Sequence, residues 1–242
     1  MPTTQELAKA SESAYDNSTP ENYSRLSELS DNDIHTYKHN TENHHIIAHR
    51  GTDLNAETAK RDLKTDLKIL LGQGSHTKLF NDRAKKTEDI VKKLKEQDPE
   101  TKIHLTGHSL GGSTAQHALI KSKVVRDNTD SLDTFNAGTS PLQKKGLAKS
   151  NPAYKVIAGK ATHHRTEIDD ISANAKISLI GKVKNYKTNA KPSIARAVLN
   201  YLKPKLNHSV TGKIAHFAAD KILNTLEAHS LHNFTKTKLK GI

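Results

Sequence analysis

The run Lys102-Ile-His-Leu-Thr-Gly-His-Ser-Leu-Gly-Gly112 is the strongest indication of the fold of this chain. A short run typical of a buried strand leads into the pentapeptide Gly107-His-Ser-Leu-Gly111, and a run typical of a helix, Gly112 to Lys121, follows it. A G-x-S-x-G pentapeptide between a strand and a helix predicts a sharp, strained turn that presents the serine hydroxyl above the edge of a sheet. Glycines on both sides of the serine let the two backbones pass without a clash.

Ser109, inside this turn, is a candidate nucleophile. The N–H group of the next residue, Leu110, points toward the same place and can bind a developing oxyanion. A serine hydroxyl is a weak nucleophile until a histidine accepts its proton, and a carboxylate must fix the tautomer of that histidine. The turn therefore favours a serine esterase. The chain has 15 histidines, so chain order alone does not select the partners of Ser109.

Strands and helices are expected to alternate along the chain. Strands are expected near 44–49, around Ile103, at 131–136 and at 154–164; helices are expected at 3–15, 56–71, 78–97 and 112–121, with a polar, turn-rich stretch at 16–33. A capping box of Thr3 and Glu6 opens the first helix. The alternation predicts an α/β fold in one domain, residues 1–242, with a mostly parallel central sheet flanked by helices.

Composition limits the classes of protein to consider. With 242 residues the chain can bury a real core, although only 33% of residues are hydrophobic and 4% are aromatic. There is no cysteine, so we expect neither disulfides nor thiolate metal sites. The first residues lack a basic region followed by an apolar run, so no signal peptide is expected, and no window resembles a membrane span. The compartment in which the protein works stays open.

The net charge of +12 is unevenly placed. From Ile171 through Ala219 there is no Asp or Glu, and this stretch offers two amphipathic helices, at 193–202 and 209–226. We expect a basic helical insertion at about 174–226. A positively charged segment of this kind attracts polyanions, and we favour an anionic membrane surface over nucleic acid as its partner. Two alternatives stay open: a lysine-rich face that serves solubility, and helices that simply cover the sheet.

The chain resembles class 3 (fungal-lipase-like) lipases. The resemblance rests on Ile46-Ile-Ala-His-Arg-Gly-Thr52, Asp62-Leu-Lys-Thr-Asp66, Leu105-Thr-Gly-His-Ser-Leu-Gly-Gly112 and Phe135-Asn-Ala-Gly-Thr-Ser-Pro141. It covers roughly residues 1–175 and a short piece near 229–234, and the overall character is similar to compact lipase-like proteins of large DNA viruses. The resemblance implies an α/β-hydrolase fold and hydrolysis of lipid esters without a metal or cofactor. The basic helical insertion before the C-terminal histidine is a departure from the family.

The resemblance also implies the roles of individual residues. Ser109 matches the nucleophile, and Thr52 matches the oxyanion-hole position, where its N–H group acts together with that of Leu110. Asp169 matches the acid, and His229 resembles the C-terminal histidine that serves as the base.

Other residues compete for two of these roles. Asp170 is the alternative acid, in a rival register of the same motif, and His208, His216 and His232 compete with His229. His108 is expected to pack beneath the serine rather than to act as the base. We expect Arg50 and Asp66 to form structural ion pairs or hydrogen bonds near the oxyanion loop. The region of the family's apolar lid, 53–61, is short and polar here, which puts a preference for bulk triglyceride in doubt.

The sequence thus predicts a serine carboxylic-ester hydrolase that acts on lipids through Ser109, Asp169 and His229 and an acyl-enzyme intermediate. The alternative is a hydrolase-fold module without turnover that binds anionic membranes or nucleic acid through its basic segment, because a fold does not guarantee an activity.

Overall fold

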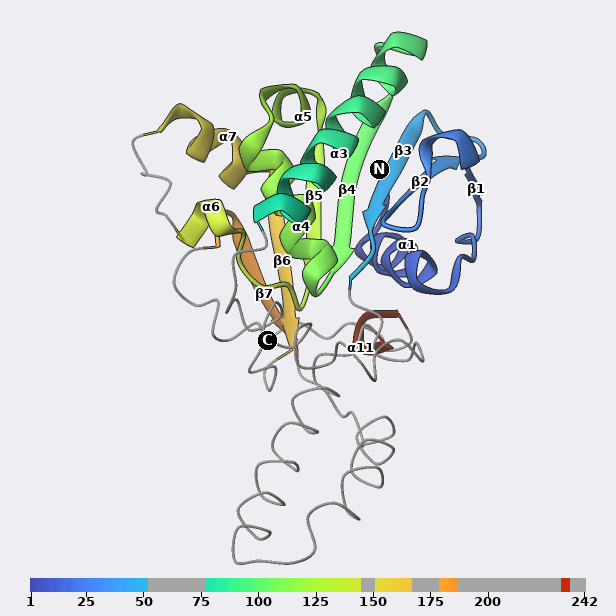
Figure 1. Ribbon diagram of the computed structural model, residues 1–242. Helices are drawn as coiled ribbons and strands as arrows, with labels where there is room; N and C mark the ends of the chain where they lie inside the picture. Colours follow the sequence, from blue (N-terminus) through green and yellow to red (C-terminus); the bar gives the residue numbers. More distant parts are fainter. Residues whose placement is uncertain (52–76, 145–150, 167–178, 187–231, 236–242) are drawn as a thin grey trace, which may run out of the picture.

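A computed structural model describes residues 1–51, 77–144, 151–166, 179–186 and 232–235 of the chain (Figure 1). Its elements, in chain order, are α1 (Thr4–Asp16), β1 (Tyr23–Arg25), the 3₁₀ helix η1 (Ser27–Leu29), β2 (Ile34–His39), β3 (His44–His49), α3 (Thr77–Gln97), β4 (Lys102–His108), α4 (Leu110–Lys121), α5 (Lys123–Asn128), β5 (Ser131–Phe135), α6 (Pro141–Lys144), α7 (Pro152–Lys160), β6 (Ala161–Thr166), β7 (Lys182–Tyr186) and α11 (His232–Thr235).

One sheet of seven strands organises the described residues, and the strands lie in the order in which the chain makes them. β1, β2 and β3 pair antiparallel, and every pair from β3 to β7 is parallel. Parallel neighbours need crossover connections, and the described helices in these connections are α3, the pair α4 and α5, and the pair α6 and α7. The predicted mostly parallel sheet with flanking helices is confirmed.

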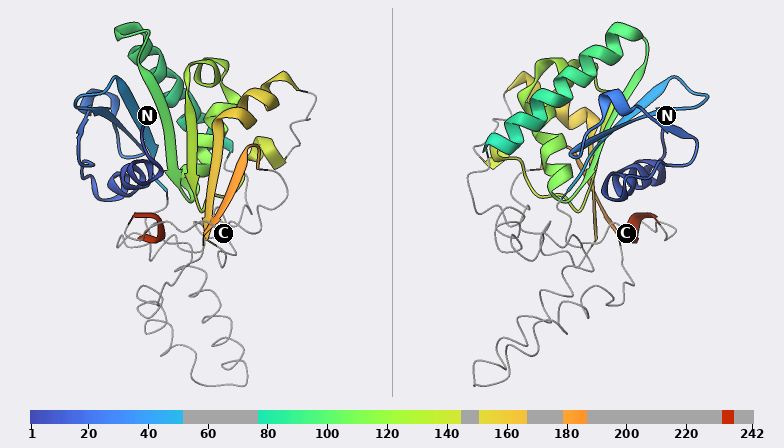
Figure 2. Two further views of the ribbon diagram at one scale, coloured as in Figure 1. Left: turned by 180° about the vertical axis from the view of Figure 1, so that it is seen from behind. Right: turned by 45° about the vertical axis from the view of Figure 1, so that its right-hand side comes forward.

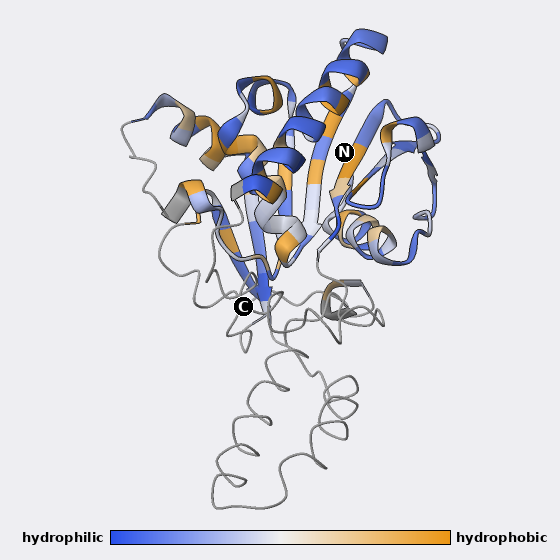
Figure 3. Ribbon diagram, viewed as in Figure 1, coloured by the Kyte–Doolittle hydropathy of each residue, from blue (hydrophilic) through white to orange (hydrophobic). Residues whose placement is uncertain are grey.

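Helices cover both faces of the sheet (Figure 2). α3, α4, α5 and α7 lie on one face, where Val91, Leu94, Leu105 and Leu119 belong to the larger apolar cluster. α1 and α11 lie on the other face, where a second cluster includes Leu7, Tyr37, Phe135 and Phe234. Figure 3 shows apolar residues along the strands and polar ones on the outer turns of α3, as expected for an amphipathic helix against a sheet.

Several elements agree closely with the sequence prediction. The capping box of α1 is present: the Thr3 hydroxyl accepts the Glu6 N–H at 3.2 Å, and the Glu6 carboxylate accepts the Thr3 N–H at 2.7 Å. β3 has the predicted bounds, and α3 begins one residue before the predicted helix. The helix after Ser109 begins at Leu110, two residues earlier than expected.

The sequence prediction missed the first strands. The polar stretch 16–33 contains β1 and η1, and β2 follows it at Ile34–His39. β2 reads as polar, yet its first four residues are buried. Its Thr36 hydroxyl donates to the Leu29 carbonyl at 2.7 Å, and its His35 ring contacts the Tyr37 hydroxyl at 3.1 Å. Polar side chains that satisfy one another in this way can be buried without the apolar alternation that usually marks a strand.

The predicted strand at 154–164 is wrong in its first part. α7 occupies Pro152–Lys160, and β6 begins only at Ala161. The Asn151 side chain accepts the Ala153 N–H at 2.9 Å, and Pro152 stands in the first turn, a combination that starts helices.

The sequence prediction also missed β7, which lies within the segment expected as a basic helical insertion, at about 174–226. β7 pairs in parallel with β6, and its last residue, Tyr186, is buried. The geometry of the sheet decides this segment, because a short lysine-rich run carries little strand signal of its own. The expected helices at 56–71, 193–202 and 209–226 lie outside the described residues.

No helix in the described part of the chain is long and apolar enough to cross a bilayer. Within the same residues, no cluster of three or more His, Asp or Glu side chains is arranged to hold a metal ion.

Candidate active site

Ser109 occupies a strained turn between the end of β4 and the start of α4. Its backbone angles are φ 57° and ψ −124°, a region that non-glycine residues seldom adopt. Its N–H donates to the Phe135 carbonyl at 3.0 Å, and its own carbonyl accepts the Ser113 N–H at 3.1 Å. The predicted turn with Ser109 at its apex is therefore present, and its hydrogen bonds hold it to β5 and to α4.

The two glycines of the pentapeptide are required by close backbone contact. A Cβ atom on Gly107 would lie 2.5 Å from the carbonyl carbon of Gly111. A Cβ atom on Gly111 would collide with the His49 carbonyl oxygen and would lie 2.9 Å from the Arg50 carbonyl carbon. The first turn of α4 therefore lies directly against the end of β3.

This first turn also supplies potential donors. The first N–H groups of an α-helix have no acceptor within the helix, and α4 begins at Leu110. Ser109 itself is only 4% exposed, so an anion that formed beside it would be largely removed from water. Leu110 thus lies next to Ser109 at a helix N-terminus, and its role in an oxyanion hole stays a prediction.

The end of the turn after β3 lies beside the elbow. A Cβ atom on Gly51 would lie 2.7 Å from the carbonyl oxygen of His108, the residue before Ser109. Thr52, the predicted second oxyanion donor, follows Gly51 directly but lies outside the described residues. Asp66 and the polar lid region 53–61 lie outside them as well.

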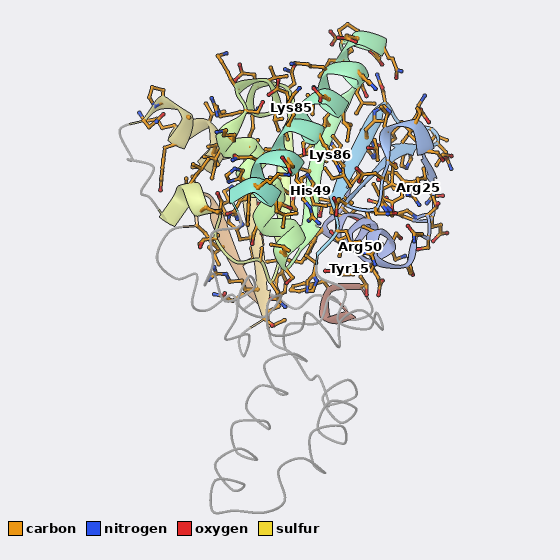
Figure 4. All side chains as sticks on the ribbon, viewed as in Figure 1. Tyr15, Arg25, His49, Arg50, Lys85 and Lys86 are labelled. Carbon is orange, nitrogen blue, oxygen red and sulfur yellow. The ribbon has the colours of Figure 1, made fainter. Side chains whose placement is uncertain are left out.

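Tyr15 joins the two halves of this site, and sequence reasoning missed it. Its hydroxyl lies 2.9 Å from Nδ1 of His108 and directly against Gly51. Figure 4 shows Tyr15 and Arg50 near the lower end of the sheet. A tyrosine in the last turn of α1 carries no signal for this contact, because the packing of α1 on the sheet creates it. His108 is 8% exposed and packs against Tyr15, in agreement with its expected packing role.

His49, the last residue of β3, is hydrogen-bonded to the two helices that pack beside the Arg50–Gly51 turn. Its ring nitrogens lie 3.0 Å from the hydroxyls of Thr114, on α4, and Thr87, on α3. Burial, together with the nearby Arg83 charge, lowers the pKa of His49 to about 3. A neutral His49 therefore links β3 to both helices across the neutral pH range.

The predicted acid and base all lie outside the described residues: Asp169, the alternative Asp170, and His229. Among the residues named as competitors for the base, His208 and His216 lie outside as well. For His232 only the backbone, at the start of α11, is described.

The described residue nearest in sequence to Asp169 lies at the same edge of the sheet as Ser109. β6 ends at Thr166, whose N–H donates to the Asn136 side chain at 2.9 Å. Asn136 follows Phe135, the residue that binds the Ser109 N–H. The end of β6 thus lies beside the end of β5.

α11 is anchored near the elbow. The Phe234 ring is fully buried, 5.0 Å from the Phe135 ring and 5.7 Å from the Tyr186 ring between centroids. The Gln5 side chain donates to the Thr235 carbonyl at 3.2 Å. Phe135 therefore contacts α11 with its ring and Ser109 with its carbonyl.

His164 forms a close histidine–carboxylate contact, but it is already engaged. Its Nε2 lies 2.8 Å from the Asp133 carboxylate, and its Nδ1 lies 2.9 Å from the Tyr186 hydroxyl. Burial raises the pKa of Tyr186 above its ordinary value. Because both ring nitrogens are bound, His164 connects β5, β6 and β7 and does not offer a free nitrogen to Ser109.

The chain is similar to known lipases in sequence pattern and in fold. The model of the family described as lipase (class 3) matches residues 46–143. Among solved structures, the chain is similar to the Rhizomucor miehei lipase propeptide complex, at 16% identity over 77% of this chain and 68% of that chain, with a TM-score of 0.48. It is also similar to a triacylglycerol lipase whose catalytic centre is a serine protease triad, at 17% identity over 77% of both chains, with a TM-score of 0.45. No curated protein matches the chain.

The matched residues extend from β3, through Ser109 and its turn, to α6. They include the Arg50–Gly51 turn, the G-x-S-x-G pentapeptide and the Phe135–Pro141 segment on which the resemblance rests. Over residues 46–143, the chain thus matches the class 3 lipase family, as the resemblance of its sequence predicted.

Proposed function

We propose that this protein is a serine carboxylic-ester hydrolase that acts on lipids, and that residues 1–242 form one hydrolase domain. The observation that carries the proposal is the strained backbone of Ser109 between β4 and α4. Strain of this kind costs about 1–3 kcal/mol and persists where surrounding structure enforces it, most often at functional sites. A serine that served only as a helix cap would not need it.

In the proposed reaction, the Ser109 hydroxyl attacks the acyl carbonyl while His229 accepts its proton. Asp169 orients His229 and stabilises the imidazolium that forms. The alcohol leaves with a proton from His229, and water then releases the fatty acid from the acyl-enzyme by the same steps. Because the role of Asp169 rests on family resemblance, Asp170 remains the alternative acid.

The tetrahedral oxyanion is bound, in this proposal, by the N–H groups of Leu110 and Thr52. Each such donor contributes about 3 kcal/mol to the transition state. The closeness of Gly51 to the His108 carbonyl supports this assignment, because it brings the residue before Thr52 to the residue before Ser109.

Replacement of the nucleophile tests the proposal. We expect the wild-type protein to hydrolyse a p-nitrophenyl ester of a medium-chain fatty acid, and Ser109→Ala to lose this activity while keeping its circular dichroism spectrum and melting temperature. Ser113→Ala is a suitable control, since Ser113 is also buried, in the first turn of the same helix. Turnover by Ser109→Ala at the wild-type rate contradicts the proposal.

The substrate class we favour is the anionic phospholipid. The stretch from Ile171 to Ala219 contains no carboxylate, and lysines near a surface contribute about 1 kcal/mol each to binding an anionic membrane. Hydrolysis should be faster on vesicles that contain phosphatidylglycerol than on pure phosphatidylcholine vesicles, and salt should reduce the difference. Vesicle binding without hydrolysis favours the second candidate function, a membrane-binding module without turnover.

A further inference from the structure

Arg83, on α3, contacts the outer side of the turn that leads from β3 to Thr52. It is only 6% exposed, although it carries a charge. Its Nη1 donates to the carbonyl oxygen of Arg50 at 2.6 Å, and its Nη2 forms an ion pair with Oδ1 of Asp33 at 2.9 Å. The fork of one guanidinium therefore joins the turn to the loop that precedes β2.

These contacts close a ring around Arg50. The Arg50 N–H donates to the backbone carbonyl of Asp33 at 2.9 Å, while the Asp33 side chain binds Arg83 and Arg83 binds the Arg50 carbonyl. The N–H and the carbonyl of Arg50 are thus both held by the Asp33–Arg83 pair. Such a ring restricts both backbone dihedrals of Arg50, two residues before the proposed oxyanion donor.

The ring also lies against the elbow. A Cβ atom on Gly111 would lie 2.9 Å from the Arg50 carbonyl carbon, and that carbonyl is the group to which Arg83 donates. Nη1 of Arg83 is also 3.5 Å from the Thr114 hydroxyl, on α4. Arg83 therefore connects the residue after β3 to α4, the helix that begins at Leu110.

A buried guanidinium is a costly way to stabilise a fold. Removing such a charge from water costs several kcal/mol, and a well-packed apolar pair is often at least as stable, by about 1–4 kcal/mol. Within the described residues, the Nε atom of Arg83 is buried without a hydrogen-bond partner, which adds to the cost. The fork geometry supplies what an apolar pair does not: two directed hydrogen bonds that fix a backbone turn.

We propose that Arg83, together with Asp33, is a positioning residue that holds the oxyanion turn against the elbow. This inference rests on the proposed hydrolase function and names residues that the catalytic triad does not include. An oxyanion hole acts only in the transition state, so its misplacement lowers kcat and leaves KM nearly unchanged. A loss of fold stability alone changes the amount of active protein and not its rate per active site.

The test measures kcat, KM and the fraction of active sites in Arg83→Gln, Arg83→Lys and Asp33→Asn. We expect kcat per active site to fall about 10- to 100-fold in Arg83→Gln, in the range of a weakened oxyanion contact, with KM within about twofold of wild type. Arg83→Lys keeps the charge but cannot donate along both arms of the fork, so its kcat should be intermediate. Asp33→Asn should show a smaller loss of the same kind.

Two controls separate positioning from general effects. Lys85→Met removes the same unit of charge from α3, and Lys85 pairs with Asp89 at 2.6 Å, without a described contact to Asp33 or to the Arg50 backbone. Leu94→Ala weakens the core under the same helix by about 2–5 kcal/mol. Both should keep kcat per active site at the wild-type value.

The outcomes are distinct. If the wild-type protein has neither turnover nor titratable active sites, the proposed function fails, and this inference fails with it. If the wild-type protein turns over and Arg83→Gln and Arg83→Lys keep its kcat, or if Lys85→Met and Leu94→Ala lose kcat equally, the positioning role alone is wrong. Should Arg83→Gln fail to fold, Arg83→Lys and Asp33→Asn decide the question.

Discussion

At the scale of single residues, the site depends on backbones that touch. Gly107, Gly111 and Gly51 allow contacts that a Cβ atom would prevent, and Ser109 holds a positive φ between them. The sequence predicted the role of the first two glycines, because the pentapeptide has a fixed mechanical meaning. It did not predict Tyr15 or Arg83, because their contacts arise from the packing of α1 and α3 against the end of β3.

Tyr15 offers a test at this scale. Tyr15→Phe removes the hydroxyl that lies 2.9 Å from His108 and keeps the ring in place. We expect a stability loss of about 1 kcal/mol, typical of one hydrogen bond, and a several-fold lower kcat, because the hydroxyl also touches Gly51. Urea denaturation and ester hydrolysis measure the two effects. Tyr154→Phe, in α7, is the control that should leave kcat unchanged; equal rates in both variants contradict the role of Tyr15.

At the scale of elements, sequence patterns predicted the long and regular segments and missed the short polar ones. α1, β3, α3 and β5 could be recognised from capping, spacing or an apolar run. β2 could not be recognised, because its buried polar side chains hydrogen-bond with their neighbours. β7 could not be recognised, because its pairing with β6 makes it a strand and its own sequence carries little strand signal. The same reason explains α7, where the helix start signal at Asn151 and Pro152 outweighs the strand-like residues that follow.

α11 is the element whose attachment matters most for the proposed base. Phe234→Ala should remove the ring that packs on Phe135 and Tyr186, at a cost of about 3–5 kcal/mol if α11 remains docked. We expect a lower melting temperature together with slower labelling of Ser109 by a fluorophosphonate, since His229 lies five residues before Phe234. Ile157→Ala, at an equally buried position in α7, should lower the melting temperature only. If Phe234→Ala reacts as fast as wild type, α11 does not position the base.

At the scale of the whole molecule, buried histidines give the fold a pH dependence. Burial lowers the pKa to about 3 for His49 and to about 4 for a further set: His35, His45, His104, His117 and His163. An unfolded histidine titrates near its ordinary pKa of about 6.5. Below that pH the unfolded chain binds protons that the folded chain refuses, so stability falls as the pH decreases.

The free energy of unfolding should therefore be nearly flat above about pH 7.5 and fall steeply between about pH 6.5 and 4, by up to about 1.4 kcal/mol per pH unit for each such histidine. Urea titrations across this range measure the slope. The ring of His45 contacts the Thr101 hydroxyl at 2.9 Å. His45→Gln should reduce the slope of unfolding free energy against pH by the contribution of one histidine. A flat profile from pH 7 to 4 contradicts the burial of these rings as neutral groups.

The most direct test of the central claim is the covalent labelling of wild-type protein and His229→Ala by a fluorophosphonate, with the adduct located by peptide mass spectrometry. We predict one adduct, on Ser109, in the wild-type protein, and a labelling rate at least about 100-fold lower in His229→Ala, because the serine then lacks its base. The absence of an adduct on Ser109, or equal labelling of the two proteins, contradicts a Ser109–His229 catalytic pair.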